Sequence, residues 1–335
     1  MMELLNRKKT GKVERPVKVL QFGEGNFLRA FVDYMIDIAN EQGKFNGDIV
    51  LVKPIEFGSL DRFHDQECQY TVQLRGIVDG EPKRINRIVT SVADAVDAYG
   101  EYQKYADYAK LDSLRYIVSN TTEAGIVYDD TDRLEMEPPK SYPGKLTKFL
   151  YERYKHFNGA MDKGLVMLPV ELIDDNGIHL KECVEKLAVL WNLEDGFKTW
   201  LDEACVFTST LVDRIVTGYP RDEAEELCKE FGYQDNLIVT GEPFALWVIE
   251  SAKDISKEFP LPDAGLPVIF TDNQKPYKQR KVRILNGAHT SFVLASYLCG
   301  NDIVLESMQD ELIFNFMKAT IFDEVIPTLT LPKQD

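Results

Sequence analysis

The chain has 335 residues, is 44% hydrophobic and carries a formal net charge of -16. Its length exceeds that of one ordinary hydrophobic core, so we expect two domains. The acidic balance argues against nucleic-acid and anionic-membrane partners, because binding to phosphate groups depends on clustered Lys and Arg.

The first half of the chain alternates predicted strands with predicted helices. Short apolar runs bounded by turn residues indicate buried parallel strands. These runs lie at 17–22, 48–53, 115–120 and 164–172. Alternating patterns at 70–77 and 84–92 predict a hairpin, and helical patterns cover 97–110 and 144–157. We therefore expect an α/β fold with a Rossmann-like, doubly wound, mostly parallel sheet.

Helical patterns dominate the chain from about residue 178 onward, interrupted by predicted strands at 237–240 and 267–270. The Pro-rich segment 258–267 is the best linker candidate. We expect a nucleotide-binding domain over residues 1–265 and the start of a mainly α-helical domain over residues 266–335. The chain stops soon after an apolar segment, so we expect the helical domain to be incomplete.

A glycine turn follows the first predicted strand, in the stretch LQFGEGNFLRAF. Gly23 and Gly25 form a G-x-G between a strand and a helix, where backbone N–H groups and a helix N-terminus favour a pyrophosphate. The third glycine of the usual fingerprint is replaced by Leu28, so the motif alone is a weak signal. The alternatives are a turn that needs glycine only for positive φ, or a pocket for S-adenosylmethionine.

Polar residues after the next strands are candidates for contacts with the nucleotide. An acidic residue normally follows the second strand and binds the adenosine ribose. Lys53 stands there instead, which leaves the choice between NAD and NADP open, and Glu56 is the best ribose candidate. Asn120 and Thr121 follow the strand at 115–120 and either lie under the cofactor or cap a helix.

Three polar residues share one sector of a predicted helix in the stretch KVRILNGAHTSF. At about 100° per residue, Asn286 lies about 140° and His289 about 80° from Lys281. A hydride transfer at a carbinol needs a proton donor and donors for the developing alkoxide. Lys281 would exchange the proton, Asn286 would stabilise the alkoxide and His289 would orient the lysine or bind a hydroxyl. The alternatives are a solvated basic helix end, a surface Asn and a structural His.

Lys281 lies in a local basic cluster within an otherwise acidic chain. The cluster would attract an anionic small-molecule substrate and destabilise the charged form of a buried lysine among its members. Its members are Lys275, Lys278, Arg280, Lys281 and Arg283.

The cysteines and the N-terminus indicate an intracellular setting. The five cysteines form no C-x-x-C pair and no zinc-spaced Cys/His cluster, so we expect reduced thiols and no metal site. The N-terminus lacks the apolar core of a signal peptide, and no run of 18 apolar residues occurs. We expect a cytoplasmic protein without a membrane span.

Five motifs, in order, resemble the polyol-specific long-chain dehydrogenases, the mannitol dehydrogenase family. They are FGEGNFLRAF, TTEAG, LVDRI, EPFALWVIE and the K-x-x-x-x-N-x-x-H of KVRILNGAH. The resemblance implies NAD-linked, metal-independent, reversible reduction of D-tagaturonate to D-altronate in a cleft between two domains. It also implies that Lys281 is the general acid/base, Asn286 the alkoxide stabiliser and His289 the third member of the set.

The resemblance assigns further residues to the site. Gly23, Gly25, Asn26 and Phe27 fall on the family's cofactor loop. Asp213, Arg214 and Glu242 are expected to line the substrate site.

The sequence departs from the family pattern in two ways. A second alkoxide-binding Asn of the family has Leu172 in its place, beside Glu171, and the family continues beyond residue 335. Fructuronate or a polyol such as mannitol as substrate, and a non-catalytic nucleotide-binding protein, therefore stay open as alternatives. The oligomeric state is not predicted.

Overall fold

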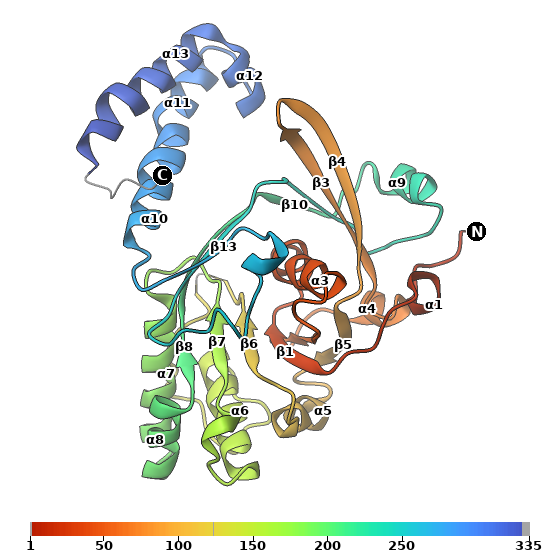
Figure 1. Ribbon diagram of the computed structural model, residues 1–335, viewed down its shortest axis with the longest axis vertical. Coiled ribbons are helices and arrows are strands. Elements are labelled where there is room, and N and C mark those ends of the chain that lie inside the picture. The colour runs from red at the N-terminus through yellow and green to blue at the C-terminus, as the bar shows by residue number, and fades with distance from the viewer. Residues whose placement is uncertain (1, 123, 330–335) are drawn as a thin grey trace. The chain divides into compact units, whose positions relative to one another are not determined.

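The computed structural model describes residues 2–122 and 124–329. The chain divides into two compact units, Met1–Thr271 and Asp272–Asp335. Figure 1 shows strands and helices interleaved in the first unit and helices in the second. Glu123 of the TTEAG motif and the last six residues of the predicted helical domain lie outside the described residues.

A six-stranded parallel sheet forms the centre of the first unit. Its strand order is β5-β2-β1-β6-β7-β8, which is the order of a doubly wound dinucleotide-binding sheet. The strands are β1 (Val17–Phe22), β2 (Asp48–Lys53), β5 (Val92–Asp97), β6 (Tyr116–Ser119), β7 (Val166–Pro169) and β8 (Val206–Phe207). The predicted Rossmann-like fold is confirmed.

The two faces of this sheet contact two different layers of helices. In β1, Val19 faces a core that includes α3 (Tyr34–Glu41), whereas Leu20 and Phe22 face the opposite core. That opposite core contains residues of four further helices. They are α5 (Tyr102–Asp107), α6 (Tyr142–His156), α7 (Asn176–Leu190) and α8 (Asp195–Glu203). Because both faces are covered, most residues of these strands are apolar, which is why the sequence reveals most of the strands.

Two smaller sheets complete the first unit, together with several short helices. One sheet has the order β10-β11-β3-β4 and the other β13-β12-β9. Their strands are β3 (Tyr70–Val78), β4 (Glu81–Val89), β9 (Ser209–Asp213), β10 (Val216–Gly218), β11 (Val239–Gly241), β12 (Leu246–Glu250) and β13 (Val268–Thr271). The short helices include α1 (Arg7–Thr10), α2 (Asn26–Leu28), a π-helix (Arg29–Asp33), α4 (Asp61–Asp65) and α9 (Ala224–Phe231).

Three local expectations differ from the structure. Helical patterns were expected to dominate from about residue 178, but the strands β8 to β13 lie between Val206 and Thr271. The residues after Val89 form the separate strand β5 of the main sheet, where the sequence indicated the end of a hairpin and the start of a helix. The proposed linker 258–267 is packed in the first unit, because Phe259 and Leu261 are fully buried in its core. The prolines on either side of Leu261 indicated a linker, but the burial of Leu261 in the core fixes this segment.

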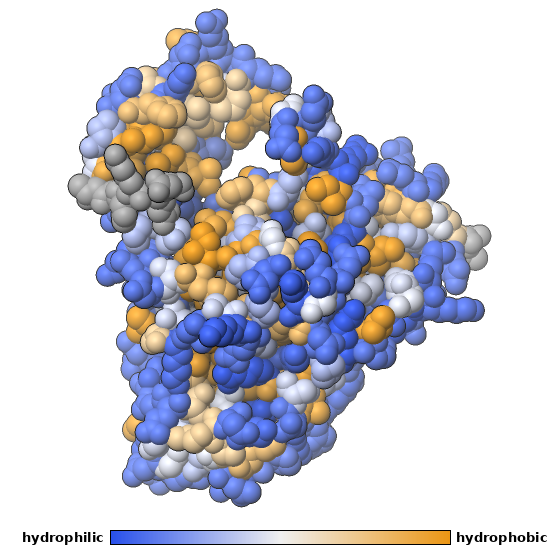
Figure 2. Space-filling model, viewed as in Figure 1, coloured by the Kyte–Doolittle hydropathy of each residue, from blue (hydrophilic) through white to orange (hydrophobic). Residues whose placement is uncertain are grey.

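The second unit consists of helices over its described residues. They are α10 (Lys275–Arg280), a π-helix (Lys281–Asn286), α11 (Gly287–Leu298), α12 (Val304–Gln309), α13 (Glu311–Ala319) and a second π-helix (Thr320–Val325). Many large apolar side chains of these helices are exposed, among them Leu294, Leu298 and Leu312. Figure 2 shows hydrophobic residues on the visible surface of this unit. None of the helices in the described part of the chain is both long enough and apolar enough to cross a bilayer.

Candidate functional site

A cavity of about 460 Å³ lies at the carboxyl ends of the central strands of the first unit. It is bounded by the loop after β1 and the loop after β6, which are adjacent strands where the strand order reverses. Open α/β sheets bind ligands at this position. The cavity is lined by Gly23, Glu24, Gly25, Pro54, Ile55, Asn120, Thr121, Thr122, Ala124, Gly125, Val127, Asp129, Lys140, Ser141 and Tyr142.

The two glycines of the G-x-G turn serve different purposes. Gly23 has a φ of 120°, and a Cβ there would lie 3.1 Å from the carbonyl oxygen of Asn120. Gly23 therefore allows the two loops to approach closely. A Cβ on Gly25 would meet no atom within 4 Å and would project into open space. The turn thus leaves room for a ligand to reach the backbone at Gly25, as a pyrophosphate requires.

Arg29 holds the glycine loop in place through hydrogen bonds, and the sequence analysis did not predict this role. Its guanidinium donates to the carbonyl oxygen of Glu24 (3.2 Å), to Oδ1 of Asn26 (2.7 Å) and to the carbonyl oxygen of Leu237 (2.6 Å). Phe27 stacks on Phe31 with ring centroids 5.0 Å apart. The predicted loop residues Asn26 and Phe27 are thus held by the first unit itself.

A buried carboxyl group lies beneath the same loop. Asp33 accepts a 2.7 Å hydrogen bond from the Tyr70 hydroxyl, and burial raises the pKa of Asp33 to about 7. Gln21 lies beside this carboxyl and donates through its Nε2 to the carbonyl oxygen of Gly23. Oδ1 of Asp33 and Oε1 of Gln21 are both buried without a hydrogen-bond partner among the described residues.

Glu171 fixes the second loop of the cavity. Its carboxylate is 2% exposed and accepts hydrogen bonds from Ser119 Oγ, from the Thr121 backbone N–H and from Thr121 Oγ1, at 2.9 to 3.1 Å. Burial raises the pKa of Glu171. The neighbouring Leu172 is 65% exposed. Glu171 thus holds Ser119 and Thr121, which lie on either side of Asn120, and so fixes the segment with the predicted nucleotide contacts Asn120 and Thr121.

The end of β2 is occupied by a buried ammonium group. Lys53 lies 3.0 Å from a carboxylate oxygen of Asp97 and donates to the backbone carbonyls of Ile55 and Glu56. The side chain of Glu56, the predicted ribose partner, is exposed and does not belong to the cavity lining given above. Glu24 does line the cavity, and burial raises the pKa of its carboxyl.

The three predicted substrate residues lie at the edge of the smaller sheets. The guanidinium of Arg214 is buried and donates to the backbone carbonyls of Ala30, Pro243 and Phe244. Oε1 of Glu242 accepts from the backbone N–H of Ile215 at 2.6 Å. Asp213 is partly buried at the end of β9. These contacts fix the local backbone; the predicted substrate contacts stay predictions.

Lys281, Asn286 and His289, called the lysine set below, lie where a π-helix continues into an α-helix. Lys281 and Asn286 are the first and last residues of a π-helix, and His289 follows in α11. The prediction used the α-helical repeat, but a π-helix has i→i+5 hydrogen bonds, so Asn286 follows Lys281 by one turn. Lys281 is partly buried, whereas Asn286 and His289 are exposed. π-helical turns inside α-helices are frequent at functional sites.

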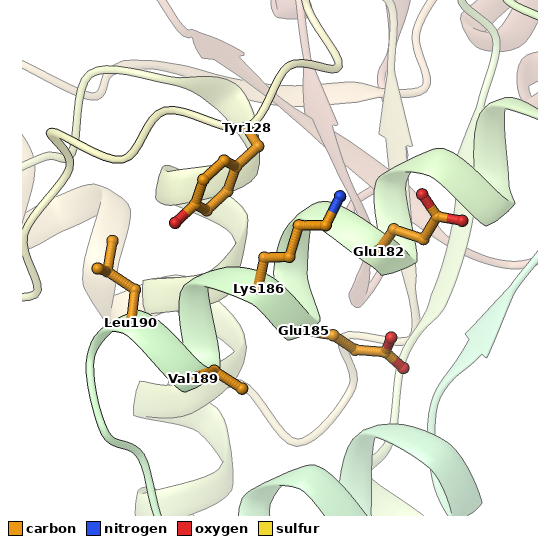
Figure 3. A pocket seen from close by; sticks show the side chains of 6 residues that line it. All are labelled: Tyr128, Glu182, Glu185, Lys186, Val189 and Leu190. Atoms are coloured by element: carbon orange, nitrogen blue, oxygen red, sulfur yellow. The ribbon is translucent and has the colours of Figure 1, made fainter.

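A second hollow of the first unit contains none of the predicted site residues. A hollow of about 480 Å³ lies beside α7, lined by Tyr128, Glu182, Glu185, Lys186, Val189 and Leu190 (Figure 3). It lies away from the strand ends and contains none of the predicted site residues. Within the described residues, no three His, Cys, Asp or Glu side chains are grouped as metal ligands.

Family models and relatives place this architecture among known proteins. Residues 17–262 match the mannitol dehydrogenase Rossmann domain, and residues 273–335 match the mannitol dehydrogenase C-terminal domain. The chain is 44% identical to an altronate oxidoreductase of Phocaeicola vulgatus and 47% identical to one of Pectobacterium atrosepticum. These alignments cover 100% of the chain and 70% and 69% of the relatives.

Solved structures show the same fold. A ternary complex of Pseudomonas fluorescens mannitol 2-dehydrogenase with NAD and D-mannitol matches with a TM-score of 0.78 at 23% identity, over 100% of this chain and 71% of that chain. A substrate-free D-sorbitol dehydrogenase matches with a TM-score of 0.82 at 21% identity, over 99% and 72%. The chain belongs to the mannitol dehydrogenase family of oxidoreductases.

Proposed function

We propose that the chain is an NAD-dependent tagaturonate reductase, also called altronate oxidoreductase, which reversibly reduces D-tagaturonate to D-altronate. The observation that carries this proposal is the identity of 44 to 47% with altronate oxidoreductases over the full chain. The proposed setting is the cytoplasm, and the proposed partner is a small anionic sugar acid.

The cavity of the first unit fits the proposed cofactor. Its volume lies within the ligand-sized range, and the open space at Gly25 admits a group that approaches the backbone. The segment with Asn120 and Thr121 is held along its wall by Glu171. Bound NADH would supply the hydride that reduces the ketone.

The second unit supplies the proposed proton chemistry. Lys281 would give a proton to the sugar oxygen as the ketone becomes a carbinol, and take it back in the reverse reaction. Asn286 would donate its side-chain amide to the developing alkoxide, and His289 would orient Lys281 or bind a sugar hydroxyl. The remaining cations of the 275–283 cluster would attract the substrate carboxylate.

Three residues of the first unit complete the proposed substrate site. Asp213 and Glu242 would line it with carboxylates that accept hydrogen bonds from sugar hydroxyls. Arg214 would maintain its shape, because its guanidinium connects the helix that begins at Arg29 with the loop 243–244. Since Leu172 cannot donate a hydrogen bond, a second alkoxide donor would come from elsewhere.

Steady-state kinetics with a panel of substrates tests this proposal. We expect D-tagaturonate to oxidise NADH with a kcat/KM at least about tenfold above those for D-fructuronate and D-fructose, since each missing or misplaced polar contact costs at least that factor. A higher kcat/KM for either competitor would assign the chain to that substrate. Binding of S-adenosylmethionine in place of NADH would contradict the dehydrogenase function altogether.

A further inference from the structure

Gln21 connects the glycine turn to the interior of the first unit. Its side chain is fully buried in β1, and its Nε2 donates a 3.2 Å hydrogen bond to the carbonyl oxygen of Gly23. The backbone N–H of Gly23 donates to the carbonyl oxygen of Val52 in β2 at 2.9 Å. The N–H of Gly23 is thus fixed by the sheet, whereas the direction of its carbonyl, and of the peptide that leads toward Gly25, depends on Gln21.

A second neighbour of the Gln21 side chain is the carboxyl group of Asp33. One oxygen of that carboxyl, Oδ2, accepts the hydrogen bond from the Tyr70 hydroxyl. The remaining oxygen, Oδ1, and the amide oxygen Oε1 of Gln21 are buried acceptors without a hydrogen-bond partner among the described residues. Buried acceptors without a donor are costly. A single proton on Oδ1 supplies the donor that both atoms lack, because a neutral carboxyl group donates and an amide oxygen accepts.

The protonation of Asp33 is set by its burial and by the groups packed around it. Asp33 is fully buried, and this burial raises the pKa of its carboxyl to about 7. Arg29, in the same π-helix, is a cation that acts on Asp33, but its guanidinium donates its hydrogen bonds to three other oxygen atoms. Asp37, in α3, is an anion that opposes ionisation, and Tyr70, in β3, is the hydroxyl donor. Asp33 therefore changes its charge near neutral pH.

Ionisation of Asp33 changes what Gln21 binds. Without its proton, Oδ1 carries negative charge and still lacks a donor among the described residues. Nε2 is the only donor of a glutamine side chain, and a carboxylate attracts a donor more strongly than a neutral carbonyl does. Nε2 is therefore drawn from Gly23 toward Asp33, and the carbonyl of Gly23 loses the hydrogen bond that sets its direction.

We propose that Asp33 and Gln21 are positioning residues of the glycine turn that binds the cofactor. The proton of Asp33 is donated to Oε1 of Gln21, which keeps Nε2 on the carbonyl oxygen of Gly23. The turn then binds the dinucleotide more tightly when Asp33 is neutral than when it is ionised. This proposal rests on the proposed function and deepens it by adding a pH dependence to the cofactor site. Neither side chain belongs to the cavity lining, so both act through the turn.

Calorimetric titration of the full chain with NADH between pH 6 and pH 9 tests the proposal, because NADH itself has no group that titrates in this range. We expect the wild-type Kd to be lowest near pH 6 and to rise about tenfold by pH 9, the factor expected for one lost hydrogen bond. Asp33→Asn is the matched variant, because its amide donates to Oε1 of Gln21 at every pH and still accepts from Tyr70. Its Kd should stay within about twofold of the wild-type value at pH 6 over the whole range.

Gln21→Met tests the second positioning residue, since it keeps the length of the side chain and removes both of its polar groups. We expect it to weaken NADH binding about tenfold at pH 6 and to remove the rise of the Kd with pH. Asp79→Asn, at an exposed carboxylate, should keep the wild-type profile. Circular dichroism at each pH restricts the comparison to folded protein.

Two results would overturn the proposal and leave the proposed function standing, because NADH still binds in both. One is a wild-type Kd that does not change between pH 6 and pH 9. The other is a Kd of Asp33→Asn that rises with pH as much as that of the wild type. A wild-type protein that binds no NADH at any of these pH values would overturn both the proposal and the proposed function.

Discussion

The cavity of the first unit and the lysine helix of the second unit differ in what holds their polar groups. At the cavity, Arg29 and Glu171 are buried and bind the two loops through several hydrogen bonds each. On the lysine helix, Asn286 and His289 are exposed. The proposed nucleotide pocket is thus preorganised within its own unit, whereas two members of the lysine set are exposed on their helix.

The hydrophobic cores of the two units show the same contrast. In the first unit, two large clusters cover both faces of the central sheet. In the described part of the second unit, Phe292, Ile313 and Ile321 are the buried large apolar side chains, while Leu294, Leu298 and others are exposed. A cofactor site on a packed sheet should therefore bind its ligand independently of the proton chemistry, and mutations should separate the two.

The largest expected effect is on the chemical step. Lys281→Ala should lower kcat for tagaturonate reduction by about 10²- to 10⁴-fold, the usual contribution of a general acid/base. The Kd for NADH should change less than about twofold, because the cavity is built by the first unit. Single-turnover kinetics and NADH titration measure the two quantities.

Lys275→Ala provides the control for charge, since Lys275 is an exposed lysine of the same cluster. We expect it to raise KM for the sugar acid by a few-fold at low salt and to leave kcat unchanged. Equal kcat values for Lys281→Ala and the wild type would remove Lys281 from its proposed role.

The next effect concerns Glu171 and cofactor affinity. Glu171→Ala removes the acceptor of three hydrogen bonds from the second loop, so NADH binding should weaken about tenfold. Glu171→Gln keeps one carbonyl acceptor for Thr121 and should recover most of the affinity. Leu172→Ala, at the exposed neighbouring position, should match the wild type; if it weakened NADH binding as much as Glu171→Ala, the loop-holding role would be wrong.

Substitutions of Gly23 and Gly25 should affect different properties, namely stability for Gly23 and NADH binding for Gly25. Gly23→Ala imposes a side chain at a φ of 120° and close to Asn120, so it should reduce the free energy of unfolding by about 1–3 kcal/mol. Gly25→Ala should leave stability unchanged within about 0.5 kcal/mol, because its Cβ meets no protein atom, and should still weaken NADH binding. Urea unfolding and NADH titration of both variants check this; a destabilised Gly25→Ala would contradict the open space there.

The last expected effect is a pH dependence of the free energy of unfolding that arises from Asp33. Its pKa in the folded state, about 7, lies above the ordinary value of 3.8. The folded state therefore binds the proton of Asp33 more tightly than the unfolded state does. The contribution of this proton to the free energy of unfolding is fully present below pH 3.8 and is lost as the pH rises through 7. Asp33→Asn should remove this loss and be more stable than the wild type at pH 8, by on the order of 4 kcal/mol at most.

The difference between Asp33→Asn and the wild type should vanish at pH 4, which urea unfolding at both pH values measures. The new amide would also donate toward Oε1 of Gln21, which has no partner among the described residues. Asp79→Asn, at an exposed carboxylate, should leave the pH dependence unchanged. If the free energy of unfolding of Asp33→Asn changed with pH as much as that of the wild type, the raised pKa of Asp33 would be wrong.

The sequence predicted the central strands because strands buried on both faces are mostly apolar, as at 17–22 and 48–53. It missed β5, whose residues VADAVD include two aspartates and form an edge strand of the main sheet. The proposed linker failed because burial of Phe259 depends on contacts with distant residues.

The candidate site was predictable only where a local pattern marks it. The glycine turn and the Lys-Asn-His spacing lie within short segments. Arg29 contacts Leu237, 208 residues away, and Glu171 contacts Thr121, 50 residues away, so no local pattern reveals these roles. The i→i+5 geometry of the lysine helix also has no signal in the α-helical repeat.

Hydrogen exchange with and without NADH tests the central claim most directly, because it locates the cofactor without a mutation. We predict slower exchange in peptides that cover the glycine turn at 23–28 and the loop at 119–126, with no change in α9, which is remote from the cavity lining. NADH that binds and leaves exchange in both loops unchanged would show that the cofactor site lies elsewhere, and the account of this cavity would be wrong.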